Sequence, residues 1–320
     1  MEQPQWVRFG ELIPCRTAFI DAHTPGSSEK ENFTIIGGGV SESPDQHVHI
    51  NATPGFNIGA AGQPPRCFNS LHSHNTAEVF FVLKGRWRFF WGETGEDGEV
   101  VLEEGDIFNI PTRLFRGFEN IGSDYGMIMS ILGGDDAGGG VIWAPHVREA
   151  AQEHGLILSE TGRLYDAKRG ESLPSGEREM PLPQQDWLDA LLRPDATTVV
   201  KYYVARYWDM MAMSAQGAVS VIGEHGLLID KPGFEVDFLS RQSPLPETLH
   251  AEKDVVLMVM RGHWSVSWQD KTEIFNPGDT IWLPGGTDYS LKVTASGEAS
   301  LFRVTRTDDP AGLTWTGEDV

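Results

Sequence analysis

The sequence predicts a mainly β protein made of two tandem barrels joined by a short helical linker. Glycine and proline, which favour turns, occur 36 and 19 times in 320 residues, as expected of many short strands. The hydrophobic content of 40% is enough for two domains that each bury a core. A pattern of glycine and tryptophan also recurs at a shift of 177 residues, which indicates a duplicated unit.

The repeat covers two stretches of each copy. At a shift of 177 and without a gap, the first stretch matches Lys84, Gly85, Trp87 and Trp91 to Arg261, Gly262, Trp264 and Trp268. At a shift of 173, the second stretch matches Gly105, Asp106 and Pro111 to Gly278, Asp279 and Pro284. The change in shift fits a shorter hairpin in the second copy. We therefore assign residues 1–143 to a first barrel with an N-terminal arm, 144–200 to the linker, and 201–320 to a second barrel with a tail.

The linker contains two predicted helices. Residues 145–155 begin with a proline, which fits the first helical position, and end with a glycine, which fits the position just past a helix. Residues 184–192 predict a second, shorter helix. Residues 160–183 are polar and rich in Gly, Ser and Pro, which predicts irregular structure at the surface. The last dozen residues show no periodicity, and we expect them to be loosely held.

Composition excludes several classes of function. The net charge of −21 and the pI near 4.8 argue against nucleic-acid binding, which needs clustered Lys and Arg, and favour a small-molecule ligand. No stretch of about 18 apolar residues and no basic-then-apolar leader occurs, so we expect no membrane contact and a cytoplasmic location. Cys15 and Cys67 lack the spacing of disulfide frameworks or zinc fingers, which favours reduced thiols.

The segment LHSHNTAEVFFVLKG, residues 71–85, contains three metal-ligating side chains. His72 and His74 are two residues apart, so on a strand they point to the same side, and a bend at residues 75–77 returns Glu78 toward them. Two imidazoles and one carboxylate with open positions form the site expected of non-haem iron(II) oxygenases. Zinc, manganese and nickel accept the same ligands.

This spacing, His-x-His-x3-Glu-x6-Gly, resembles the first sequence motif of the cupin family of small β-barrels. The resemblance covers roughly residues 60–135, and Gly105, Pro111 and Asn120 match the second motif. Arg116 stands where that motif has its last metal-binding histidine. The resemblance implies double-stranded β-helix barrels of the jelly-roll type, and the repeat then makes the chain a bicupin.

Two arginines and a phenylalanine are candidates for substrate contacts. Arg116 is either a solvated cation at the barrel mouth or a fixed guanidinium that captures a substrate carboxylate and stabilises developing negative charge. Arg113 is a weaker candidate for the same role. Phe80 follows Glu78 by two residues and is predicted to form a cavity wall for an apolar or aromatic substrate. The tryptophans of the repeat are expected to pack rather than to bind ligand.

The second copy has drifted at the ligand positions. Asp254 precedes Gly262 by eight residues, whereas Glu78 precedes Gly85 by seven. A slip of one residue reverses the face of a strand, so we expect His250 and Asp254 to point away from the cavity. The second barrel is therefore predicted to be free of metal and to serve as a structural or dimer-forming partner.

In length and architecture the chain resembles bicupin ring-cleaving dioxygenases that act on gentisate, salicylate and hydroxynaphthoate. The leading hypothesis is an iron-dependent oxygenase for a small aromatic or carboxylate-bearing substrate, with metal at His72, His74 and Glu78. One alternative is a metal-dependent isomerase, lyase or decarboxylase that does not use oxygen. Another is a metal-free cupin that binds a small anion. Apolar strands with exposed edges favour a homodimer.

Overall fold

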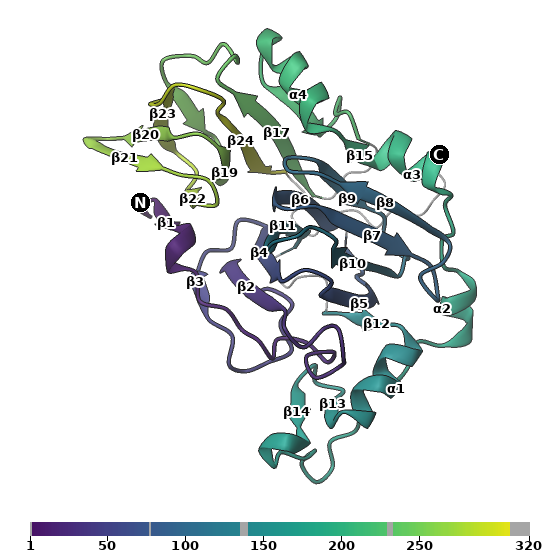
Figure 1. Cartoon of the computed structure of the whole chain (residues 1–320). Coiled ribbons are helices and arrows are strands. Elements are labelled where there is room, and N and C mark those ends of the chain that lie inside the picture. Colours follow the sequence, from purple (N-terminus) through teal and green to yellow (C-terminus); the bar gives the residue numbers. More distant parts are fainter. Residues whose placement is uncertain (1, 77, 135–139, 229–232, 308–320) are drawn as a thin grey trace.

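The computed structural model describes residues 2–76, 78–134, 140–228 and 233–307. Its chain forms the predicted pair of β-barrels, each made of two packed sheets. In Figure 1 the barrels lie side by side, and the segment that joins them runs along the first barrel. No helix in the described ranges is long and apolar enough to cross a membrane.

The first barrel has a seven-stranded and a five-stranded sheet. In spatial order the larger sheet consists of β15 (Val204–Ala205), β9 (Ile107–Ile110), β6 (Glu78–Lys84), β11 (Gly126–Gly133), β4 (Phe56–Gln63), β2 (Glu31–Ile36) and β3 (Val48–Ile50). The smaller one consists of β12 (Ile142–Trp143), β5 (Phe68–Ser73), β10 (Arg116–Asn120), β7 (Trp87–Trp91) and β8 (Gly98–Leu102). All described pairings but that of β2 with β3 are antiparallel.

The second barrel has a six-stranded and a four-stranded sheet. The larger sheet consists of β1 (Gln5–Val7), β22 (Thr280–Leu283), β19 (Val255–Arg261), β24 (Ser300–Arg306), β17 (Phe234–Ser240) and β16 (Val219–Ile222). The smaller one consists of β18 (Leu249–Ala251), β23 (Thr287–Val293), β20 (Trp264–Trp268) and β21 (Lys271–Phe275). The smaller sheets bury alternate residues, as along β7 and β20, whereas strands of the larger sheets such as β11 and β19 are buried on both faces.

The repeated tryptophans lie in the barrel cores, as predicted. Along β7 and β20 every second residue is buried, and the tryptophans of both strands are at most 2% exposed. The indole Nε1 of Trp87 donates to the Lys84 carbonyl at 3.0 Å, and that of Trp264 donates to the Arg261 carbonyl at 3.3 Å. The glycines of the two turns have φ of 95° and 70°, a conformation that favours glycine. The repeat is therefore a packing motif.

The two barrels share a hydrophobic core and exchange strands. Phe56 packs on Phe234, with ring centroids 5.6 Å apart, and Phe81 packs on Phe302 at 4.7 Å. Strand β1 precedes the first barrel in sequence but pairs with β22 of the second. Conversely, β15 pairs with β9 of the first barrel. These two crossings differ from the sequence-based boundaries, which placed residues 1–143 and 201–320 in separate barrels.

The linker is more regular than predicted. Among the described residues, the linker forms α1 (Pro145–Glu153), α2 (Gln185–Asp189), most of α3 (Ala196–Tyr203) and a 3₁₀ turn at Ala167–Arg169. Outside it lie α4 (Tyr207–Met213) and the 3₁₀ turns at Phe9–Glu11 and Ser214–Gln216. Helices α1 and α2 confirm the predicted helices. Strands β13 (Leu156–Leu158) and β14 (Leu164–Asp166) form a hairpin that reaches into the segment expected to be irregular. The tail at residues 308–320 lies outside the described residues.

Candidate metal centre

The structure brings His72, His74 and Glu78 together at one end of the first barrel. His72 lies on β5, His74 directly follows that strand, and Glu78 begins β6. One ligand atom from each lies within 4.8 Å of those of the other two, and the side chains are 2–5% exposed. In the described part of the chain, no other group of three His, Cys, Asp or Glu side chains converges in this way.

Each imidazole is oriented by a backbone carbonyl. The Nδ1 atom of His72 lies 2.8 Å from the Ser70 carbonyl oxygen, and that of His74 lies 2.8 Å from the Gly140 carbonyl oxygen. A carbonyl can only accept, so each Nδ1 donates and each Nε2 keeps its lone pair. The Nε2 of His74 lies 3.7 Å from Glu78 Oε2, so that lone pair faces the carboxylate. Backbone support of this kind is usual around metal-ligating histidines.

The electrostatic environment keeps both histidines neutral. Burial, followed by the nearby Arg116 guanidinium, lowers the pKa of His72 well below its usual range. The same two causes lower the pKa of His74 to about 4, against the opposing influence of the Glu78 carboxylate. Neutral imidazole is the form that binds metal, so these ligands need not release a proton near neutral pH.

Arg116 lies beside these residues as a buried, paired cation. It begins β10, where it pairs in register with His72, and its side chain is 2% exposed. Its Nη2 donates to Glu78 Oε2, and its Nη1 donates to the His72 carbonyl oxygen at 3.1 Å. Its Nε has no hydrogen-bond partner within the described chain. The alternative of a solvated cation at the barrel mouth is therefore wrong, and the guanidinium is already engaged by the carboxylate.

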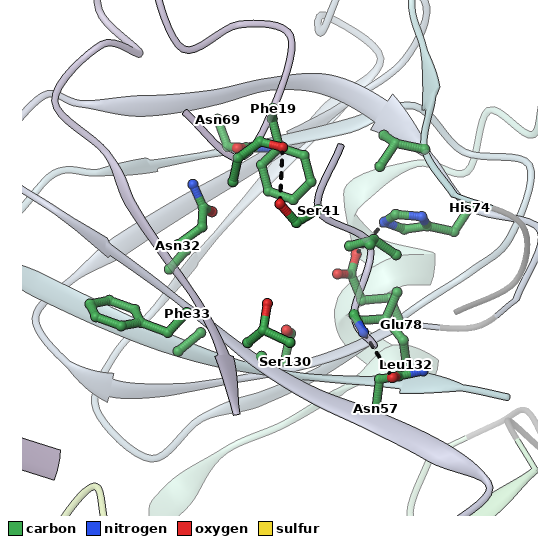
Figure 2. Close-up of a pocket in the computed structure, with 18 of the residues that line it drawn as sticks. Phe19, Asn32, Phe33, Ser41, Asn57, Asn69, His74, Glu78, Ser130 and Leu132 are labelled. Carbon is green, nitrogen blue, oxygen red and sulfur yellow. Dashed lines mark hydrogen bonds and ion pairs between the residues drawn. The ribbon is translucent and has the colours of Figure 1, made fainter. Parts of the chain in front are cut away.

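A cavity opens beside the three ligands, as Figure 2 shows. The cavity offers about 60 Å³ of space to the centre of a water molecule. One bound water needs roughly 10–15 Å³ of such space. The space therefore has room for about four to six waters. The N-terminal arm contributes Cys15, Ala18 and Phe19 to the lining, which sequence reasoning did not anticipate.

The other predicted contacts divide between the cavity and the surface. Phe80 is 3% exposed, lines the cavity and packs against Phe118 with ring centroids 5.2 Å apart. Arg113 is exposed and has a φ of 57°, and its carbonyl accepts from the Leu192 backbone at 2.9 Å. Neither Arg113 nor Arg116 is among the described residues that line the cavity. The structure thus brings Phe80, but neither arginine, to the cavity wall.

Comparison with known proteins relates one stretch of the chain to a family. The family described as "Cupin domain" matches residues 62–132, which include all three candidate ligands and Arg116. These residues, which form the centre of the first barrel, match a cupin domain. A search of curated proteins gives no match to the sequence.

Solved structures share this cupin fold along nearly the whole chain. Salicylate 1,2-dioxygenase from Pseudaminobacter salicylatoxidans is 16% identical, with a TM-score of 0.54 over 96% of this chain and 84% of that one. A variant of Bacillus subtilis oxalate decarboxylase is 12% identical, with a TM-score of 0.52 over 95% and 77%. The YlbA protein from E. coli is 9% identical, with a TM-score of 0.52 over 95% and 90%. Identities this low show a shared fold alone.

In the second barrel, the drifted residues make other contacts. The Nδ1 of His250 lies 2.6 Å from an Asp288 carboxylate oxygen, and both side chains are exposed. Asp254 accepts from the Trp282 indole at 3.2 Å and from the Gly285 backbone at 2.9 Å. His250 and Asp254 are thus each engaged by a different partner, away from one another.

A buried ion pair supports the strand that carries His72. Lys30 and Asp21 are both fully buried and paired through their side chains. The Lys30 Nζ also donates to Asn69 Oδ1 at 2.8 Å, and Asp21 Oδ2 accepts from the Ser70 backbone at 3.0 Å. Ser70 in turn orients His72. The sequence offered no signal for this contact, because nothing in it places the N-terminal arm next to β5.

A second buried carboxyl lies behind the cavity wall. Glu42 accepts from the Ile20 backbone at 2.8 Å and from the Trp143 indole at 2.6 Å. Trp143 lines the cavity and packs against the His72 ring, with centroids 5.4 Å apart. Burial raises the pKa of Glu42 to about 8, although both hydrogen bonds oppose the shift. The folded protein therefore holds a proton on Glu42 near neutral pH.

We expect Glu42 to make the stability of the protein fall as pH rises. Between pH 4.5 and about 8 the native state binds this proton and the unfolded state does not, so stability is fully present below pH 4.5 and is lost toward pH 8. The slope from this group is roughly 1.4 kcal/mol per pH unit in that window. Urea unfolding at pH 5, 6, 7 and 8 should show a flatter profile for Glu42→Gln than for the wild type. An exposed control, Glu153→Gln, should keep the wild-type slope, and equal slopes in all three proteins would contradict the assignment.

Proposed function

We propose that this cupin is a metal-dependent oxygenase, with iron(II) as the metal, that acts on a small aromatic or carboxylate-bearing substrate in its first barrel. The convergence of two neutral imidazoles and one carboxylate on a single buried point supports the proposal. The donor set fits iron(II), and manganese, nickel or zinc would accept it as well. Three protein ligands leave positions open for other molecules.

The residues of the chain have separable roles in this proposal. His72 and His74 would hold the metal through Nε2, since each Nδ1 lies at a backbone carbonyl, and Glu78 would hold it through Oε1, because Arg116 engages its other oxygen. Arg116 is thus a positioning residue for Glu78. A bound iron(II) would supply open positions at which dioxygen and substrate meet. Phe80 and Phe118 provide apolar walls against which a substrate ring can be oriented.

Two other functions are compatible with the fold, and features of the site bear on each of them. The similar structures include both a dioxygenase and a decarboxylase, so a metal-dependent decarboxylase, lyase or isomerase that works without oxygen is the second candidate. A metal-free cupin that binds a small anion is the third. The Arg116–Glu78 pair favours this third candidate, because the two charges neutralise each other without a metal. A cytoplasmic homodimer remains part of the proposal.

Metal content and oxygen uptake test the proposal together. We expect close to one iron per chain in protein purified without chelators, little metal in His72→Ala, and oxygen consumption with hydroxylated aromatic acids. His146→Ala, which changes an exposed histidine on α1, is the matched control and should keep its metal. Metal without oxygen uptake would favour the decarboxylase class. No metal after anaerobic loading with iron or manganese would support the third candidate, a metal-free protein that binds a small anion.

A further inference from the structure

The cavity has a wall that faces the metal ligands from across the larger sheet. Along that sheet, β11 follows β6, then β4, then β2. Ser130 on β11 pairs with Phe80 on one side and with Gly59 on the other, and Asn32 on β2 lies three strands from Glu78. Figure 2 shows His74 and Glu78 on one side of the space, Asn32 on the opposite side and Ser130 between them.

The described lining of this cavity carries one carboxyl side chain, Glu78, and no lysine or arginine. Both cations nearby are already neutralised by buried partners, Arg116 by Glu78 and Lys30 by Asp21. The wall opposite the ligands therefore has no positive charge to offer to a substrate anion.

Two polar side chains on that wall are free to bind a ligand. The Asn32 amide nitrogen is buried without a hydrogen-bond partner in the described structure, and the Ser130 side chain lines the cavity. The other lining amides are occupied: Asn57 by Gly39 and Gly134, and Asn69 by Lys30. A Cβ at Gly59 would lie 3.0 Å from the Ser130 hydroxyl, so the glycine keeps that hydroxyl open.

We propose that Asn32 and Ser130 form a neutral specificity site that selects substrates whose far end is an uncharged hydroxyl or carboxamide. This inference rests on the proposed function, because it takes the near end of the substrate to be held at the metal. A hydroxyl both donates and accepts, as do a carboxamide and a serine, so the groups pair without an unsatisfied atom. Any carboxylate of the substrate then belongs at the metal.

A carboxylate at the far end is disfavoured for an electrostatic reason. It would lose its water on entering the cavity and gain no cation in return, and buried charges without a partner are costly. Its oxygens could accept from Asn32 and Ser130, but two neutral hydrogen bonds do not replace hydration of a full charge. The specificity site therefore discriminates by charge as well as by hydrogen bonding.

Three hydroxypyranones that differ at one position test this site by binding alone. Allomaltol, kojic acid and comenic acid share the same bidentate metal-binding head and carry methyl, hydroxymethyl and carboxylate groups at the same ring position. Titration into the cobalt(II)-loaded protein, followed by its visible spectrum, measures each affinity. We expect kojic acid to bind roughly three- to tenfold more tightly than allomaltol, and at least about tenfold more tightly than comenic acid.

Variants assign the preference to the two residues. Asn32→Leu and Ser130→Ala should each bring the affinity for kojic acid down to that for allomaltol, and leave allomaltol itself unchanged. Ser123→Ala, at an exposed position, should keep the full wild-type preference. Cobalt content after desalting confirms that the metal stays in the protein throughout the titrations.

Two outcomes overturn the inference in different ways. Normal cobalt uptake with comenic acid bound as tightly as kojic acid, or with the preference intact in both cavity variants, would overturn the specificity site and leave the proposed metal centre standing. A protein that takes up neither cobalt nor iron would overturn the metal centre together with the inference.

Discussion

Replacing Glu78 with alanine is expected to abolish metal binding and to destabilise the fold by about 3–5 kcal/mol. The first effect follows because Glu78 supplies the only carboxylate among the three converging ligands. The second follows because Arg116, whose side chain is 2% exposed, would keep a buried charge without its partner. Metal content by elemental analysis and urea unfolding at neutral pH measure the two effects separately.

A double variant separates the ion pair from the metal. In Glu78→Leu/Arg116→Met both charges are gone, so most of the lost stability should return while metal binding stays absent. The surface pair of Arg193 and Glu93 is the control, because both side chains are about half exposed and Glu93→Ala should cost less than about 1 kcal/mol. A full complement of iron in Glu78→Ala would remove this residue from the ligand set.

Replacing Lys30 with methionine is the second change with a large expected effect. Asp21 would remain fully buried without a cation, and the expected loss of stability is again about 3–5 kcal/mol by urea unfolding. Asn69 would also lose its hydrogen bond to Lys30, although Ser70 keeps its bond to Asp21, so His72, which contacts Asn69, would be held less firmly. We expect metal affinity to fall by roughly 10–100-fold, as it does when the groups that orient a ligand are removed.

A double variant that also replaces Asp21 tests whether the charge of Lys30 or its hydrogen bond to Asn69 controls stability and metal affinity. Lys30→Met/Asp21→Leu should recover stability but not metal affinity, because Asn69 still lacks its bond to Lys30 and Ser70 now loses its bond to Asp21. Arg169→Met, which breaks an exposed pair with Asp45, is the control and should alter neither property. If Lys30→Met unfolds at the wild-type urea concentration, the pair contributes nothing to the fold.

Local patterns in the sequence predicted the features that depend on neighbouring residues. The spacing of His72, His74 and Glu78 sufficed because strand alternation and one bend decide where the three side chains point. The helix at 145–153 followed from its proline and from the glycine after it. The paired tryptophans could be assigned to packing because they recur in the copy that lacks the ligand spacing.

Features that depend on distant contacts could not be predicted in this way. The segment ATTVVKYY of α3 is rich in β-branched residues and looks like a strand, yet it forms a helix capped by Asp195, whose side chain accepts from the Thr198 backbone. The sequence showed that Arg116 replaces a histidine, but not that its partner is Glu78. The burial of Lys30 beside β5 depends on a fold that brings residues 39 positions apart into contact.

The path of the N-terminal arm gives the second barrel a structural role at the cavity of the first. Strand β1 is fixed on β22 of the second barrel, and about ten residues later the same segment covers the cavity of the first with Cys15, Ala18 and Phe19. The second barrel thus anchors the segment that covers the candidate site, although it supplies none of the three candidate ligands. A chain trimmed to the first barrel would lose this anchor, and we expect its cavity to open to bulk water.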